Sequence, residues 1–351
     1  MRRIAQLDGL RALAVGLVVV NHCVSWFPGG GIGVDVFFVL SGFLITSLLV
    51  DETERYGRIG RLRFYARRGL RLYPALLAML LVTSLLLSVG LKQVLLAGTY
   101  TSDLALAWGN ESMGPYIHTW SLALEEQFYL LWPLLLPFVL RLRVRWAVGL
   151  LVSLAIASAV AAQARVGHML TPAGDVGFGV FNPFWQAHGL LIGCALALVL
   201  RHRRDWPGVV PAAWGGLAVC IAVAIAASAT VDQHWAAIWN LIAEFAAALL
   251  IAGLVVSAGS LSRVFAWTPV VWIGARSYAI YLWHLPLILY AEQHLDRPLA
   301  PIVGAAAGVV AAAISWRVVE LPFLRLKDRF APHAPDAVPA WQQGAAAPAA
   351  R

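Results

Sequence analysis

The sequence predicts an all-α integral membrane protein, a bundle of about ten transmembrane helices with both termini in the cytoplasm. Of its 351 residues, 60% are hydrophobic and 13% are charged, whereas soluble domains are about 45–50% apolar and about 25% charged. Apolar runs long enough to cross a bilayer recur along the chain. Arginines gather in every second connection between these runs. Together these observations predict a multi-pass protein of the plasma membrane.

The apolar runs lie between residues 9 and 319, and each is expected to form one span. The fourth run is the least apolar because it contains Glu125, Glu126 and Pro133, and the sixth run is short. The ten runs are Gly9–Phe27, Val34–Val50, Leu70–Leu91, Leu122–Leu140, Trp146–Ala164, Phe184–Leu200, Val209–Ala229, Trp235–Ser257, Val270–Ala291 and Leu299–Val319.

Basic residues mark one side of the membrane. They precede the first run and then follow each even-numbered run, whereas the other connections hold at most one isolated Lys or Arg. The positive-inside rule places the basic connections in the cytoplasm. This topology also accounts for the net charge of +8, so nucleic-acid binding is not expected. Three cysteines in apolar segments, without C-x-x-C spacing, predict neither a disulfide nor a metal site.

The two ends of the chain carry their own signals. The basic N-terminus could open a signal peptide, but Asp8 and Arg11 interrupt the following apolar run, and no small-residue cleavage site follows His22. The first run is therefore expected to remain as a span. Residues 1–330 are expected to form the transmembrane domain. Residues 331–351, rich in Pro and Ala, predict a disordered cytoplasmic tail.

The first run contains two polar residues that are costly in a membrane. Arg11 lies near its cytoplasmic end and His22 towards its far end, about 16 Å further along a helix. Ionisable residues within a span indicate a functional site. Asp35, on the other side of the turn at Pro28–Gly30, is expected at the depth of His22. A carboxylate there can fix the tautomer of a general base, although a hydrogen bond that only packs the two helices is equally compatible.

The fourth run begins in the segment PYIHTWSLALEEQFYLLWP, which contains His118, Trp120, Glu125 and Glu126. Adjacent residues of a helix point about 100° apart, so the two glutamates are expected to have different roles. Glu125 is the candidate for the site, although the spacing alone does not decide which glutamate faces inward.

The ninth run contains His284, followed by Pro286. A proline kinks a helix and frees a backbone carbonyl one turn back. His284 is expected at the depth of His22, where it either supports the site or hydrogen-bonds a carbonyl near the kink. Asn240 and Glu244 share a face of the eighth run and are weaker candidates.

A cationic group of residues is expected at the cytoplasmic side. Arg68 and Arg71 are three residues apart, on one helical face, and suit a phosphate. Arg11 enters the membrane on the same side, and Glu320 ends the tenth run. Glu320 alternatively neutralises Arg11 or Arg317, and the arginines alternatively serve topology and lipid-headgroup contact.

Cations at one pole and a His/Asp/Glu group at the other suit an extended anionic donor such as a coenzyme A thioester. Arg11 and His22 also form an R-x10-H pattern that resembles the membrane acyltransferase-3 family. The resemblance continues in order from Leu7 to about Arg325. It rests on the blocks LDGLRALAV, GVDVFFVLSGFLITSLL, FYARRGLRLYPA, HTWSLALEEQFYLLWP, IGARSYAIYLWHLP and VELPF.

This resemblance implies a ten-helix O-acyltransferase that moves an acyl group, usually acetyl, from cytoplasmic acyl-CoA. The acyl-CoA is a co-substrate rather than a bound cofactor, and the acceptor is a hydroxyl of a carbohydrate, glycoconjugate or glycosylated secondary metabolite. Relatives that modify envelope polymers often carry a further extracytoplasmic domain after this one; its absence from this sequence favours a small or lipid-linked acceptor.

The resemblance also assigns roles to residues. It implies that His22 is the catalytic histidine, that Arg11 is the arginine of the motif, and that Arg68 and Arg71 contact coenzyme A. The other residues that fall in shared blocks are Trp120, Glu125 and Glu320.

The mechanism expected from these assignments uses His22 as the general base, oriented by Asp35 or a glutamate. A covalent acyl-histidine is the competing mechanism. A transporter of a small polar metabolite would also explain ionisable residues within spans, but not the arginine pair aligned with Arg11. A structural scaffold would leave these residues without a purpose.

Overall fold

The computed structural model describes residues 4–24, 27–108, 111–169, 181–202, 208–229, 236–296 and 298–327, and over these ranges its regular elements are all helices. The long helices are α1 (Ala5–Cys23), α2 (Ile32–Tyr56), α3 (Arg61–Leu87), α6 (Thr119–Val139), α7 (Val144–Met169), α8 (His188–His202), α9 (Val209–Ala229), α10 (Ala236–Val256), α13 (Ser277–His294) and α14 (Leu299–Ser315). The short elements are η1 (Pro28–Gly31), α4 (Leu91–Gly98), α5 (Ser102–Trp108), η2 (Gly114–Tyr116), α11 (Ser260–Phe265), α12 (Thr268–Ala275), the π-helix η5 (Trp316–Glu320) and α15 (Leu321–Lys327). The predicted tail, 331–351, lies outside the described residues.

Seven helical stretches in the described part of the chain are long and apolar enough to cross a membrane, which agrees with the predicted class of multi-pass, all-α membrane protein. They are Pro28–Tyr56, Arg61–Leu87, Thr119–Val139, Val144–Ala164, Val209–Ala229, Ala237–Val256 and Leu299–Leu326. The other three predicted spans are not among these long, apolar helices. The first is α1, which carries Asp8 and Arg11, and the sixth is the shorter helix α8. The ninth is divided at Arg276 into α12 and α13.

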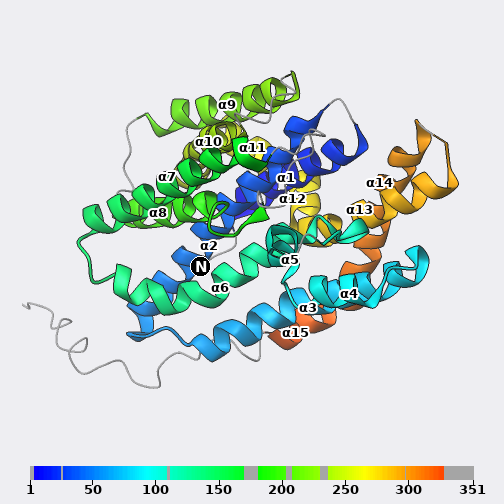
Figure 1. Cartoon of the computed structure of the whole chain (residues 1–351). Coiled ribbons are helices and arrows are strands. Elements are labelled where there is room, and N and C mark those ends of the chain that lie inside the picture. Colours follow the sequence, from blue (N-terminus) through cyan, green and yellow to red (C-terminus); the bar gives the residue numbers. More distant parts are fainter. Residues whose placement is uncertain are drawn as a thin grey trace, which may run out of the picture.

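The two N-terminal helices occupy the middle of the bundle (Figure 1). Helix α2 packs against α8 and α10, and α9 covers α10. On the other side, α1 contacts α12 and α13, while α13 packs against α14 and α3. These two central helices carry Arg11, His22 and Asp35, three of the residues that the sequence singled out.

Helix α1 crosses its neighbours with backbones in direct contact. A Cβ atom added at Gly9 would lie 1.9 Å from the carbonyl oxygen of Phe265, and one added at Gly274 would lie 1.6 Å from that of Asp8. Small residues allow such close approach between helices in membranes, where the dispersion contacts of close packing drive association. These crossings hold α1 against α11 and α12.

The turn between α1 and α2 is as tight as the sequence predicts. It is formed by η1 at Pro28–Gly31. A Cβ atom at Gly30 would lie 2.4 Å from the carbonyl oxygen of Leu17, and one at Gly33 would lie 2.3 Å from that of Ala14. Because both positions exclude a side chain, the register of the two helices is set close to the turn.

We expect Gly9→Ala to lower the free energy of unfolding by about 1–3 kcal/mol, since overpacking a close contact forces the helices apart. The measurement is the midpoint of thermal unfolding of the protein purified in detergent. Gly16→Ala, on the same helix with nothing within 4 Å of the added Cβ, is the control and should leave the midpoint unchanged or slightly raised. Equal midpoints for the two variants would contradict the close crossing.

Candidate functional site

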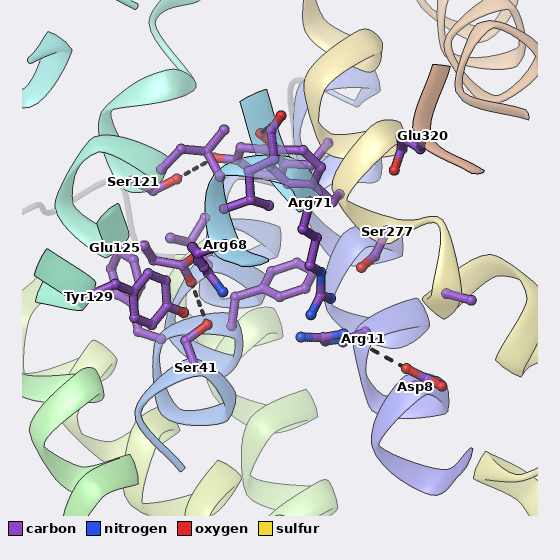
Figure 2. Close-up of a pocket in the computed structure, with 18 of the residues that line it drawn as sticks. Asp8, Arg11, Ser41, Arg68, Arg71, Ser121, Glu125, Tyr129, Ser277 and Glu320 are labelled. Atoms are coloured by element: carbon purple, nitrogen blue, oxygen red, sulfur yellow. Dashed lines mark hydrogen bonds and ion pairs between the residues drawn. The ribbon is translucent and has the colours of Figure 1, made fainter. Parts of the chain in front are cut away.

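A cavity of about 470 Å³ lies between α1, α2, α3, α6 and α13 and is closed by the segment from η5 to α15. It brings together five residues that the sequence singled out: Arg11, Arg68, Arg71, Glu125 and Glu320. Figure 2 shows these side chains around one opening, with those of α3 and α6 facing Arg11 of α1. The cavity therefore joins groups from the two ends of the sequence into one site.

Arg68 is already neutralised by a partner. Its Nε and Nη2 atoms donate to Oε1 of Glu126 at 3.0 and 2.8 Å, and its guanidinium lies 3.6 Å from the centre of the Tyr129 ring. Glu125 instead accepts a hydrogen bond of 2.7 Å from Ser41 within the cavity. The two adjacent glutamates thus have different partners, as their angular separation predicts.

Arg11 and Arg71 are the cations better placed to receive an anion. Arg11 lies 3.8 Å from the carboxylate of Asp8, beyond hydrogen-bond length, and over the described residues Arg71 has no ion pair. Arg71 interacts electrostatically with both Arg11 and Arg68. Like charges repel strongly where the effective dielectric constant is low, so an anion between the guanidinium groups would relieve this repulsion. Because Arg68 is paired with Glu126, it is not the free partner of Arg71 that the sequence suggested.

Glu320 closes the cavity opposite Glu125 and is buried. It is the last residue of η5, and short π-helical segments often occur at functional sites. Its electrostatic neighbours are Arg71 and Arg276, whereas the sequence suggested Arg11 or Arg317. Its Oε1 atom has no hydrogen-bond partner among the described residues.

A histidine cluster lies next to the cavity, at Tyr281. His22, on the last turn of α1, places its Nδ1 atom 3.1 Å from Nε2 of His284 on α13. The His118 ring centre lies 5.4 Å from that of His284. Tyr281 lines the cavity, and its ring centre lies 5.5 Å from those of both His118 and His284. Residues predicted at one depth are thus in contact.

Pro286 explains how this cluster is held. It has no N–H group, so the Leu282 carbonyl one turn earlier lacks its helical donor. The Nε2 atom of His118 lies 3.2 Å from that carbonyl oxygen and can replace the missing donor. Tyr281 donates its hydroxyl to the carbonyl oxygen of His118 at 2.9 Å. The start of α6 is therefore tied to the turn of α13 that precedes Pro286.

Asp35 does not join His22, contrary to the sequence-based expectation. It faces α8 and α10, where it interacts electrostatically with Glu244 and His188. The Nδ1 atom of His188 lies 2.5 Å from Oε1 of Glu244, and both side chains are fully buried. Similar depth did not predict contact because two residues at one depth can leave their helices in different directions. The sequence signal for His188 was its position in an apolar run.

Trp120 lies beside the cavity and does not line it. Its ring centre is 6.0 Å from that of Phe38, which lines the cavity, and 5.4 Å from that of Phe181. Trp120 therefore supports the wall of the site from behind. Tyr281, which connects the cavity to the histidines, lies in the shared block IGARSYAIYLWHLP, but nothing in the sequence favoured it over the other residues of that block.

The fold and the site define an integral membrane protein with a cationic cavity next to a histidine cluster. The chain belongs to the membrane acyltransferase-3 family, because residues 4–319 match the family described as an acyltransferase domain.

Among its relatives is a protein named peptidoglycan O-acetyltransferase OatA of Listeria monocytogenes, which is 33% identical over 91% of this chain and 55% of its own length. The O-acetyltransferase OatA of Staphylococcus aureus is 32% identical over 92% of this chain and 57% of its own length. The chain thus spans about half the length of these relatives. No solved structure matches it. The names of both relatives refer to O-acetyltransferases.

We expect Glu244→Leu to lower the free energy of unfolding by about 3–5 kcal/mol, because it leaves His188 buried without its partner. The double variant His188→Phe/Glu244→Leu should recover most of this loss, since apolar replacement of both partners removes the unpaired group. The midpoint of thermal unfolding in detergent measures both effects. A double variant no more stable than Glu244→Leu would contradict the pairing.

Proposed function

We propose that the protein is an O-acyltransferase that moves an acyl group from acyl-CoA to a hydroxyl of a carbohydrate, glycoconjugate or glycosylated small molecule. The observation that carries this proposal is one cavity with three guanidinium groups on its wall, those of Arg11, Arg68 and Arg71, and, at Tyr281, a contact to the histidine cluster. A coenzyme A thioester has the matching shape, with phosphates at one end of a thin arm and the reactive carbonyl at the other.

The donor's phosphates lie against Arg11 and Arg71 in this proposal. Guanidinium groups bind phosphate oxygens through paired, charge-assisted hydrogen bonds. Glu126 and Tyr129 hold Arg68 beside them. Since the positive-inside rule places the arginine-rich connections in the cytoplasm, the donor enters from that side.

The pantetheine arm extends from the arginines towards Tyr281. Glu125 faces this route and is the carboxylate we place beside the amide groups of the arm. Phe37 and Tyr281, with ring centres 6.4 Å apart, both line the cavity and flank the end of the route. The thioester then lies at the boundary between the cavity and the histidine cluster.

His22 acts as the general base. Its Nε2 atom removes the proton of the acceptor hydroxyl while the oxygen attacks the thioester carbonyl carbon. A carbon–oxygen bond forms, the carbon–sulfur bond breaks, and the leaving thiolate takes the proton from His22. In the competing mechanism Nε2 attacks first, releases coenzyme A and forms an acyl-histidine that the hydroxyl then cleaves.

The relatives indicate which acyl group and acceptor to assay first. Their names refer to O-acetylation, and one of them names peptidoglycan. Acetyl-CoA with a cell-envelope carbohydrate is therefore the first pair to assay, followed by small or lipid-linked glycosides.

We expect His22→Ala to reduce acetyl transfer by about 10²–10⁴-fold, which is the contribution of a positioned general base. The assay measures acetyl-CoA consumption by purified protein in the presence of the acceptor. The control is His202→Ala, because His202 makes a similar contact to a backbone carbonyl, that of Leu198, and lies on α8, outside the histidine cluster. Folded His22→Ala protein with wild-type turnover would rule out the assignment.

We expect Arg11→Ala and Arg71→Ala each to weaken coenzyme A binding by about tenfold or more, since a hydrogen bond to a charged group contributes about 1.5–3 kcal/mol. Titration calorimetry with coenzyme A measures this, and Arg141→Ala, whose guanidinium lies over the Phe138 ring, is the control. Wild-type protein without any coenzyme A binding would instead favour a transporter of another solute.

A further inference from the structure

The hydrogen-bond partners of His284 define its tautomer. Its Nδ1 atom lies 2.7 Å from the carbonyl oxygen of Tyr281. A carbonyl oxygen can only accept a hydrogen bond, so Nδ1 carries the hydrogen, and in the neutral ring Nε2 carries the lone pair. His284 thus presents an acceptor to His22.

His22 has its Nδ1 atom between two acceptors. The carbonyl oxygen of Val18 lies 2.9 Å away, and Nε2 of His284 lies 3.1 Å away. Nδ1 carries a single hydrogen, which these two acceptors share, so in the neutral ring Nε2 of His22 is unprotonated. That is the nitrogen which a general base needs free.

We propose that His284 is a positioning residue that accepts a hydrogen bond from Nδ1–H of His22, fixes the His22 tautomer and stabilises the imidazolium formed during acyl transfer. This inference rests on the proposed function. When Nε2 of His22 takes the acceptor proton, the Nδ1–H bond stays in place and the new positive charge faces the His284 lone pair. When the leaving thiolate takes that proton back, His22 returns to the same tautomer.

A neutral acceptor suits this place in the molecule. In a Ser-His-Asp triad a buried carboxylate holds the tautomer of the base, but an isolated carboxylate is costly in an apolar interior. Among the described residues no carboxylate pairs with either histidine, and Asp35 lies with His188 and Glu244 instead. An imidazole acceptor achieves the same orientation without burying a charge.

The surrounding helices hold His284 rigidly. Its side chain is fully buried. A Cβ atom at Gly308 of α14 would lie 2.9 Å from the Cα atom of His284, so α14 packs directly on this turn. Pro286, two residues beyond His284, leaves the Leu282 carbonyl without its helical donor. The Nε2 atom of His118 contacts that carbonyl. These contacts fix the backbone at His284, and its burial together with the hydrogen bond from Nδ1 to the Tyr281 carbonyl limits rotation of the ring.

Substitutions whose side chains differ in length and in hydrogen-bond acceptors test the role of His284. The side-chain oxygen of His284→Gln can reach the position of Nε2 and accept from His22, whereas that of His284→Asn ends short of it, and His284→Leu offers no acceptor. We expect His284→Asn and His284→Leu to lower kcat by about 10²-fold, at the lower end of a general base's contribution. We expect His284→Gln to recover kcat to within about tenfold of wild type.

The KM for acetyl-CoA should stay unchanged in all three variants, because the arginines are untouched. The matched control is His294→Leu. His294 is on the same helix and its Nδ1 atom lies 2.8 Å from the Tyr290 carbonyl, but its ring packs against Tyr290 and not against the histidine cluster. This variant should retain wild-type kcat. If His284→Leu fails to fold, the comparison of the Gln and Asn variants still decides the question.

Nitrogen-15 NMR of protein labelled at histidine gives a readout that packing alone would not change. We expect His22 in the wild type to be protonated at Nδ1 and unprotonated at Nε2, and the fraction protonated at Nε2 to rise in His284→Asn. Wild-type kcat in His284→Asn, beside inactive His22→Ala, would overturn the positioning role and leave the proposed function intact. Wild-type protein without acyl transfer would contradict the proposed function, while the NMR measurement would still decide the tautomer.

Discussion

Polar groups buried in an apolar helical bundle must be paired, since an unpaired one costs several kcal/mol. This constraint sorts the ionisable residues of the protein. Glu126 pairs with Arg68, and His188 pairs with Glu244. At the cavity, the Oε1 atom of Glu320 has no hydrogen-bond partner among the described residues, and Arg11 lies 3.8 Å from Asp8, beyond hydrogen-bond length. These groups of the cavity keep binding capacity for a ligand.

Two interruptions of regular helix shape that site. The break at Arg276 divides α12 from α13 and places irregular backbone against the cavity, which is where such backbone is tolerated at membrane depth. Pro286 then leaves the Leu282 carbonyl without its helical donor, His118 contacts that carbonyl, and the turn before the proline carries Tyr281 and His284. The cavity wall and the histidine cluster thus depend on one modified helix.

Much of this arrangement could be predicted from the sequence because depth in a membrane is a one-dimensional property. Apolar runs predicted the helices, and the inside-to-outside direction of the ninth run predicted that His284 lies at the level of His22. The direction in which a side chain leaves its helix depends on packing against other helices. For that reason Asp35 was predicted beside His22, although in the structure its electrostatic neighbours are His188 and Glu244.

The partners of adjacent charges were unpredictable for the same reason. Glu125 and Glu126 were expected to differ, but only the packing of α3 against α6 assigns Glu126 to Arg68 and leaves Glu125 with Ser41. That assignment also changes the expected phosphate site, because Arg68 is already paired and Arg11 takes its place beside Arg71.

The most direct test of the central claim is an experimental structure of the purified protein with acetyl-CoA bound. The account predicts that the phosphates contact Arg11 and Arg71 and that the thioester carbonyl lies next to Nε2 of His22. A hydroxyl between them should then be able to approach the carbonyl carbon to about 3–3.5 Å, as a near-attack geometry requires. Phosphates bound away from both arginines, or a thioester directed away from His22, would contradict it.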